Sequence, residues 1–172
     1  IDRIISELSS VAGSFAQSIK SSYECAVELN LIFGKAQLAY AMKASAPLIN
    51  NEGIIELKRA RHPLIDPKKV VPVDIKLGET FDTLVITGPN TGGKTVSIKT
   101  IGLLSLMAMC GLMLPVDDRS RISVFDNVLA DIGDEQSIEQ SLSTFSSHMT
   151  NIVKILSCAD DKSLVLIDEL GA

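Results

Sequence analysis

The chain has 172 residues, enough for one domain with its own core and an additional arm. Its formal net charge of −5 excludes a general electrostatic attraction to nucleic acid, so any such contact must be local. Its three cysteines are far apart and lack a C-x-x-C spacing, which argues against a disulfide framework or a zinc site and favours a reducing compartment.

The sequence shows no secretion signal and no membrane span. Residues 101–116 are apolar, but the run is shorter than the roughly 20 residues that a span needs, and it contains two glycines. We therefore expect a cytoplasmic protein without a membrane partner. Because residue 1 is Ile and residue 172 follows a predicted strand almost directly, we also expect the chain to belong to a longer protein.

The first 45 residues have the pattern of a long amphipathic helix. Apolar residues recur every three or four positions from Ile4 to Leu31 without a proline, which predicts either one continuous helix or two helices joined near Ser21. A single stripe of this length cannot bury itself, so we expect a partner helix. We interpret residues 1–46 as a helical arm.

A turn cluster around Pro47 and Gly53 ends this pattern and predicts a domain boundary, with residues 47–172 as a second unit. Residues 54–57 begin a segment with strand character, and alternation over 70–77 predicts a half-buried strand. Further strands are predicted at 84–87, 121–132 and 164–167. Helices are predicted from Val96 onward and over 144–159.

Residues 88–95, Gly-Pro-Asn-Thr-Gly-Gly-Lys-Thr, match the phosphate-loop pattern between a predicted strand and a predicted helix. Glycines let the backbone N–H groups point inward, so that phosphates meet several donors and the positive end of the following helix. A mere glycine-rich turn would not explain both flanking elements. The residues predicted to bind ATP are Gly88, Pro89, Asn90, Thr91, Gly92, Gly93, Lys94, Thr95 and Val96.

Residues 164–169 form an apolar run that ends in Asp168 and Glu169. In a parallel sheet such strand ends open onto the ligand crevice. We predict that Asp168 and the Thr95 hydroxyl hold Mg²⁺, that Lys94 acts on the β- and γ-phosphates, and that Glu169 activates water. The loop and the carboxylates together predict an ATPase site with Lys94 and Glu169 as catalytic residues.

Other polar residues have two open interpretations. Ser143 or Thr144 caps a helix, or the helix start meets a phosphate from a neighbouring subunit. His148 on that helix receives no chemical role, and His62 is structural or flanks the nucleotide. A basic cluster is either a solvated rim or a phosphate-facing surface. Its members are Lys58, Arg59, Arg61, Lys68 and Lys69.

Residues 87–95 resemble the distinctive phosphate loop of the MutS family of DNA-mismatch and recombination ATPases. Residues 61–63 (Arg-His-Pro) resemble the family's segment ahead of the nucleotide, 143–145 (Ser-Thr-Phe) its signature helix start, and 166–171 its metal-binding strand. The resemblance implies an α/β fold: a P-loop, ABC-type ATPase sheet with flanking helices, cut just after the metal-binding strand and preceded by a lever helix.

Two departures resemble the bacterial type 2 branch of that family. Thr91 and Thr95-Val96 replace the Met and Ser-Thr of mismatch-repair members, and residues 131–142 replace their Gly-Ala-Ser-Asp-Asp stretch. The branch implies a homodimeric, ATP-operated clamp that suppresses recombination on branched DNA and can act on stalled or collided ribosomes, with a separate nuclease domain. It also implies that Val70 and Val71 contact adenine and that Ser143 approaches the partner's nucleotide.

Two alternatives remain open at the level of sequence. One is a nucleotide kinase or GTPase, although no Asn-Lys-x-Asp guanine motif is visible. The other is a nucleotide-gated clamp of the mismatch-repair branch, in which ATP mainly controls shape. We expect ATPase activity from the full protein and slow or no turnover from these 172 residues alone.

Overall fold

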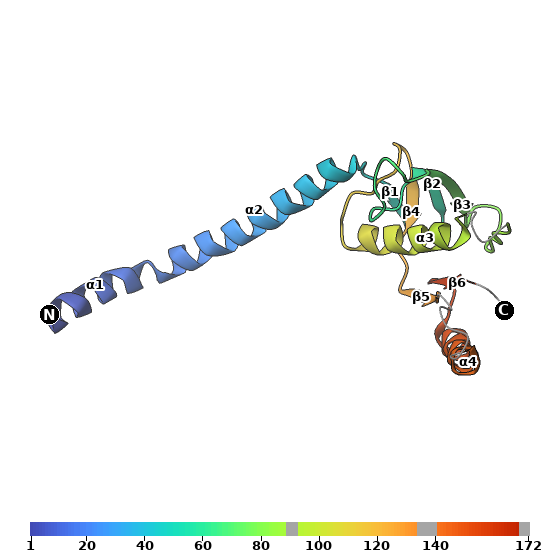
Figure 1. Cartoon of the computed structure of the whole chain (residues 1–172). Coiled ribbons are helices and arrows are strands. Elements are labelled where there is room, and N and C mark those ends of the chain that lie inside the picture. Colours follow the sequence, from blue (N-terminus) through green and yellow to red (C-terminus); the bar gives the residue numbers. More distant parts are fainter. Residues whose placement is uncertain (89–92, 134–140, 169–172) are drawn as a thin grey trace.

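The computed structural model describes residues 1–88, 93–133 and 141–168, without the side chains of 141–147. The fold is mixed α/β, as expected, and has three regions (Figure 1). A helical arm projects from a body made of a sheet and one long helix, and a smaller unit of two strands and a helix lies beneath that body.

The arm consists of α1 (Asp2–Ser14) and α2 (Ala16–Met42). The two helices meet at Phe15, not near Ser21 as expected. Phe15 has φ −103° and ψ 6°, and its N–H donates to the carbonyl of Ala12 at 3.1 Å, a tightened turn that ends α1 just after Gly13. The arm ends because Lys43 adopts a left-handed conformation with φ 49°.

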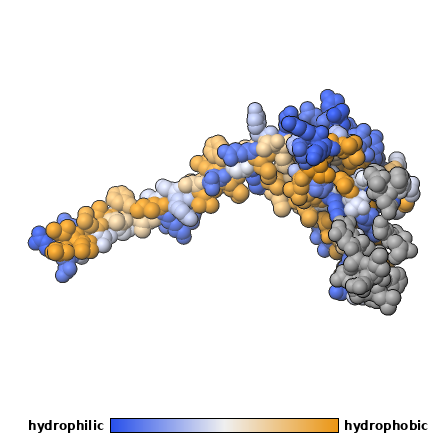
Figure 2. Space-filling view, viewed as in Figure 1, coloured by the Kyte–Doolittle hydropathy of each residue, from blue (hydrophilic) through white to orange (hydrophobic). Residues whose placement is uncertain are grey.

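An exposed apolar stripe follows both arm helices, and it appears as orange surface along the arm in Figure 2. Within α1 and α2 only Ala39 is buried. The expected stripe is therefore present, and the described residues leave it uncovered. Its members, each more than half exposed, are Ile4, Leu8, Val11, Phe15, Ile19, Tyr23, Val27 and Leu31.

The body contains a four-stranded sheet in the order β1 (Leu48–Asn50), β4 (Arg121–Ser123), β2 (Ile55–Ala60) and β3 (Val73–Leu77). β1 and β4 are parallel, and β2 is antiparallel to both β4 and β3. β3 begins at Val73, three residues later than predicted, because Pro72 has no N–H to donate to a ladder.

The core lies between this sheet and α3 (Lys94–Met109), which also packs against the second strand unit. Leu57, Leu104 and Ile122 are among the fully buried side chains. The apolar run at 101–116 is thus helix, then a largely exposed turn at 110–113, then the buried residues 114–116. Leu114 pairs with Ser45 at the exit of the arm. None of the helices in the described residues combines the length and apolar character needed to cross a membrane.

The second unit pairs β5 (Asn127–Asp131) with β6 (Ser163–Ile167) in parallel, beside α4 (Ser141–Cys158). The single strand predicted over 121–132 is wrong, because β4 and β5 belong to different sheets. Between them Val124 donates to the carbonyl of Asn50 and Asp126 to that of Lys162, so the backbone changes pairing partner there.

The strand predicted at residues 84–87 is also wrong, since these residues form no strand. Val85 is 76% exposed, and none of the described strands pairs with this segment. An apolar run becomes a strand only when a neighbour completes its ladder. The described strands form two separate small sheets, and the P-loop sheet expected from the resemblance stays a prediction.

Candidate nucleotide-binding site

The ends of the glycine loop are bent in ways that favour glycine. Gly88 has φ 147° and Gly93 has φ 80°, and a Cβ added at either position would meet no described atom within 4 Å. Lys94 reaches back across the loop, with its Nζ donating to the Gly88 carbonyl at 2.8 Å. Both ends of the loop are thus held together by the lysine predicted to act on the phosphates. Pro89, Asn90, Thr91 and Gly92 lie outside the described residues.

The loop leads into the N-terminal end of α3, which carries no side-chain cap. Its N-cap residue is Gly93, no cap hydrogen bond forms, and no acidic residue occupies the first turn. The Ser97 hydroxyl donates to the Gly93 carbonyl at 2.9 Å. Since this hydroxyl is used as a donor to a carbonyl, it does not cap the N–H groups of the first turn. Uncapped N–H groups and the helix dipole favour an anion at this point.

The predicted metal ligands come from two elements in contact. Thr95 is half-buried in the first turn of α3, and Asp168 is 9% exposed directly after β6. Among the described residues, the Asp168 carboxylate has no hydrogen bond or ion pair. α3 and β6 pack so closely at Gly102 that an added Cβ would lie 2.6 Å from Leu166 Cδ1. Glu169 lies outside the described residues.

These features are chemically compatible with Mg-ATP. Bent glycines, an uncapped helix start and a lysine make up a phosphate-binding donor set. Mg²⁺ usually takes one or two protein oxygens together with phosphate oxygens and water, so a hydroxyl and a carboxylate suffice. No cluster of three or more His, Cys, Asp or Glu side chains suited to a metal occurs in the described part of the chain.

The remaining predicted contacts lie on segments other than the loop and α3. Val70 closes the turn that begins at Asp66. Val71, which is 77% exposed, follows this turn and precedes β3. Ser143 is the third residue of α4, so the prediction that Ser143 or Thr144 caps this helix is wrong, because the helix begins at Ser141. The roles of Val70, Val71 and Ser143 toward nucleotide stay predictions.

His62 lies against the helix that follows the phosphate loop. Burial lowers the pKa of His62, and the nearby positive charge of Lys99 on α3 lowers it further. Its Nδ1 accepts a hydrogen bond from the Leu64 N–H at 3.3 Å, which fixes the turn after Arg61. Both interpretations of His62, a structural residue and one that flanks the nucleotide, stay predictions.

Sequence reasoning missed a polar cluster beside Asp168. The Asp131 carboxylate accepts hydrogen bonds from Asn151 Nδ2 at 2.8 Å and from His148 Nδ1 at 3.0 Å. Burial raises the pKa of Asp131, but these two hydrogen bonds, that of Asn151 foremost, hold it below its ordinary value. His148, which received no role from the sequence, therefore has a defined partner. The available signal was its spacing of one turn from Asn151.

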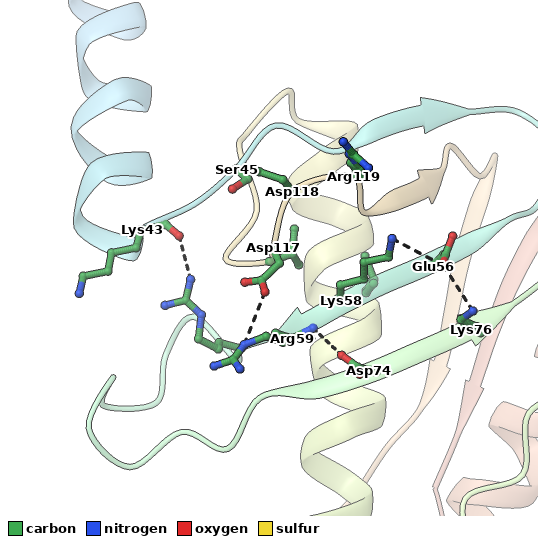
Figure 3. A pocket seen from close by; sticks show the side chains of 13 residues that line it. Lys43, Ser45, Glu56, Lys58, Arg59, Asp74, Lys76, Asp117, Asp118 and Arg119 are labelled. Atoms are coloured by element: carbon green, nitrogen blue, oxygen red, sulfur yellow. Dashed lines mark hydrogen bonds and ion pairs between the residues drawn. The ribbon is translucent and has the colours of Figure 1, made fainter.

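A charged cavity of about 900 Å³ lies elsewhere, where the arm meets the sheet (Figure 3). None of its lining residues comes from the phosphate loop or from β6. Two of its carboxylates pair with cations of the same lining: Glu56 with Lys58 and Lys76, and Asp117 with Arg59. Three predicted basic-cluster members, Lys58, Arg59 and Arg61, line it, whereas Lys68 and Lys69 do not. This favours the solvated-rim interpretation.

Comparison with known proteins identifies the family. Residues 84–172, more than half of the chain, match the family model of MutS domain V. The endonuclease MutS2 of Lachnospira eligens is 61% identical over 172 residues, which are 100% of this chain and 22% of that protein. The chain belongs to the MutS family. The endonuclease MutS2 of Caldanaerobacter subterraneus subsp. tengcongensis is 59% identical over the same shares, and that of Brevibacillus brevis 56%.

These relatives confirm the resemblance of this MutS-family chain to the type 2 branch. The chain spans only 22% of the length of these relatives. The domain V match begins at residue 84, so it covers the phosphate loop, α3, the Asp131 cluster and β6, and excludes the arm.

Proposed function

We propose that this chain binds Mg-ATP at residues 88–95 and that the full-length protein hydrolyses it. The observation that carries this proposal is the start of α3 without a side-chain cap, where Gly88 and Gly93 have positive φ angles and Lys94 reaches back to the Gly88 carbonyl. Asp168 and Thr95 would hold Mg²⁺, and Glu169 would orient or deprotonate the attacking water. The bound ion would neutralise charge that develops on the transferred phosphoryl group.

Within this proposal the full-length protein is a homodimeric clamp that acts on branched DNA and suppresses homologous recombination. The MutS2 relatives support the type 2 branch over the mismatch-repair branch, and the domain V match supports a MutS-family ATPase module. The exposed stripe of the arm supports a partner helix along α1 and α2. The proposed nuclease activity resides outside these 172 residues, and stalled or collided ribosomes are a second proposed target.

The test is Mg²⁺-dependent hydrolysis of ATP by the full-length protein. We expect Glu169→Gln to keep ATP binding and lose hydrolysis, because the carboxamide cannot accept the proton from water. Lys154→Ala on the exposed side of α4 is the matched control and should hydrolyse normally. Normal hydrolysis by Glu169→Gln would remove that residue from the proposal, and stronger competition by GTP than by ATP would favour the GTPase alternative.

A further inference from the structure

Asp131 contacts two functional elements at once. Its backbone carbonyl accepts a hydrogen bond at 2.9 Å from the N–H of Asp168, the proposed metal ligand. Its side chain, 6% exposed, accepts hydrogen bonds only from α4 among the described residues. One residue therefore joins the end of the Asp168 strand to the helix that carries Ser143.

Both partners of the Asp131 carboxylate lie one turn apart on the same face of α4. His148 and Asn151 are separated by three positions, a spacing that places side chains next to each other on a helix. Asn151 also donates to the Ala130 carbonyl at 3.2 Å. These hydrogen bonds to two adjacent residues of β5 fix both the rotation of α4 and its position along the strand.

Gly133 lets α4 come this close to the chain after β5. A Cβ at this position would lie 3.0 Å from His148 Cε1 and 3.2 Å from its Nε2, so the imidazole covers the backbone there. The Asp-Ile-Gly sequence at 131–133 thus supplies both the hydrogen-bond acceptor and the space for its donor.

Among the described side chains of α4, which begin at His148, apolar packing is limited. Ile155 is buried, but Met149, Val153 and Leu156 are 45%, 61% and 74% exposed. Among the described elements α4 packs mainly against β5. The hydrogen bonds of Asp131 consequently provide much of what orients the helix.

We propose that Asp131 is a positioning residue for ATP hydrolysis, which sets the orientation of α4 relative to Asp168 through His148 and Asn151. The inference rests on the proposed ATPase function. A helix displaced by a fraction of a turn would move Ser143, the residue expected to approach the partner's nucleotide. The chemical step therefore depends on Asp131, whereas phosphate binding at the α3 start does not.

The test uses the full-length protein with Asp131→Ala, Asp131→Asn and the matched control Asp160→Asn. Asp160 is a hydrogen-bonded carboxylate beyond the C-terminal end of α4, and it bonds to Ser163 and Lys162 instead of α4. We expect the kcat of Asp131→Ala to fall about 10- to 100-fold, because misplaced groups slow the chemical step. Its affinity for Mg-ATP should change less than about threefold, because the phosphate site at the start of α3 is unchanged. Asp131→Asn, which keeps one acceptor oxygen, should be intermediate, and Asp160→Asn normal.

Hydrogen exchange of α4 amides provides a readout without catalysis. Residues 148–158 should exchange faster in Asp131→Ala while α3 is unchanged. Unchanged kcat in folded Asp131→Ala dimers, or affinity falling in parallel with kcat, would overturn the proposal. If the natural protein does not hydrolyse ATP, the proposed function fails instead. The exchange of α4 then decides whether Asp131 positions that helix.

Discussion

The Nζ atom of Lys35, on the arm, lies 2.9 Å from the carbonyl oxygen of Cys110 at the end of α3. It also lies 3.5 Å from the carbonyl oxygen of Gly111. A cation at this end of a helix is favourable because the last carbonyls lack partners and carry the negative end of the dipole. α3 therefore has the proposed phosphate loop at its start and the arm at its end.

We predict that Lys35→Met lowers the free energy of unfolding by about 1 kcal/mol, the usual contribution of such a charged contact. Urea unfolding measures this change. Lys20→Met is the control, because Lys20 pairs only with Glu24 on the arm itself, at 3.9 Å. Equal effects of the two substitutions would mean that the Lys35 contact does not hold the arm to α3.

Gly102 sets the distance between α3 and β6, and we predict that Gly102→Ala destabilises the fold by about 1–2 kcal/mol. The new Cβ would meet Leu166 Cδ1 at 2.6 Å, and Leu166 must change rotamer in a packed core. Gly34→Ala, within α2 and with nothing within 4 Å, should instead stabilise by about 0.5–1 kcal/mol. Thermal unfolding of both variants should show opposite signs.

Lys43 ends α2 in a left-handed conformation, φ 49° and ψ 52°, which disfavours any side chain with a Cβ. We predict that Lys43→Gly raises the free energy of unfolding by about 1 kcal/mol. The Arg61 contact to the Lys43 carbonyl at 2.8 Å uses the backbone and should survive. Lys43→Ala keeps the Cβ and should give no such gain in a denaturant titration.

Glu56 makes folding stability depend on pH. The hydrogen bond from Arg121 is the largest cause that lowers the pKa of Glu56. Burial, the second-largest cause, raises this pKa, and the contacts of Lys76 and Lys58 lower it further. A carboxyl with a lowered folded-state pKa stabilises above its unfolded pKa, and this stability disappears as the pH falls through the folded-state value.

We therefore predict that Glu56→Gln unfolds more easily than the natural chain at neutral pH, and that this difference shrinks below about pH 4. Denaturant midpoints measured from pH 7 to pH 3 give the result. Glu52→Gln changes the same charge on an exposed turn and serves as the control. A difference that persists at pH 3 would show that Glu56 acts through its shape and not its charge.

The sequence predicted the elements whose patterns are local. The periodicity of the arm, the helix after the phosphate loop and the apolar strand at 163–167 all depend on neighbours within one turn or one strand. The loop motif likewise carries its chemistry in consecutive residues. These are the features for which a short segment contains most of its own physical explanation.

Features that depend on distant partners were not predictable. Residues 84–87 have strand composition but no pairing neighbour among the described strands, and the change of sheet near Val124 depends on Asn50 and Lys162. The role of His148 depends on Asp131, which lies on another element, so the spacing of His148 from Asn151 does not by itself identify their shared partner.

The most direct test of the account is calorimetric titration of the full-length protein with Mg-ATP. The natural protein and the control Lys154→Ala should bind alike, and Lys94→Ala should lose at least about tenfold in affinity, because a charged contact to phosphate contributes roughly 1.5–3 kcal/mol. Unchanged affinity of the Lys94→Ala protein would contradict the assignment of residues 88–95 as the phosphate site.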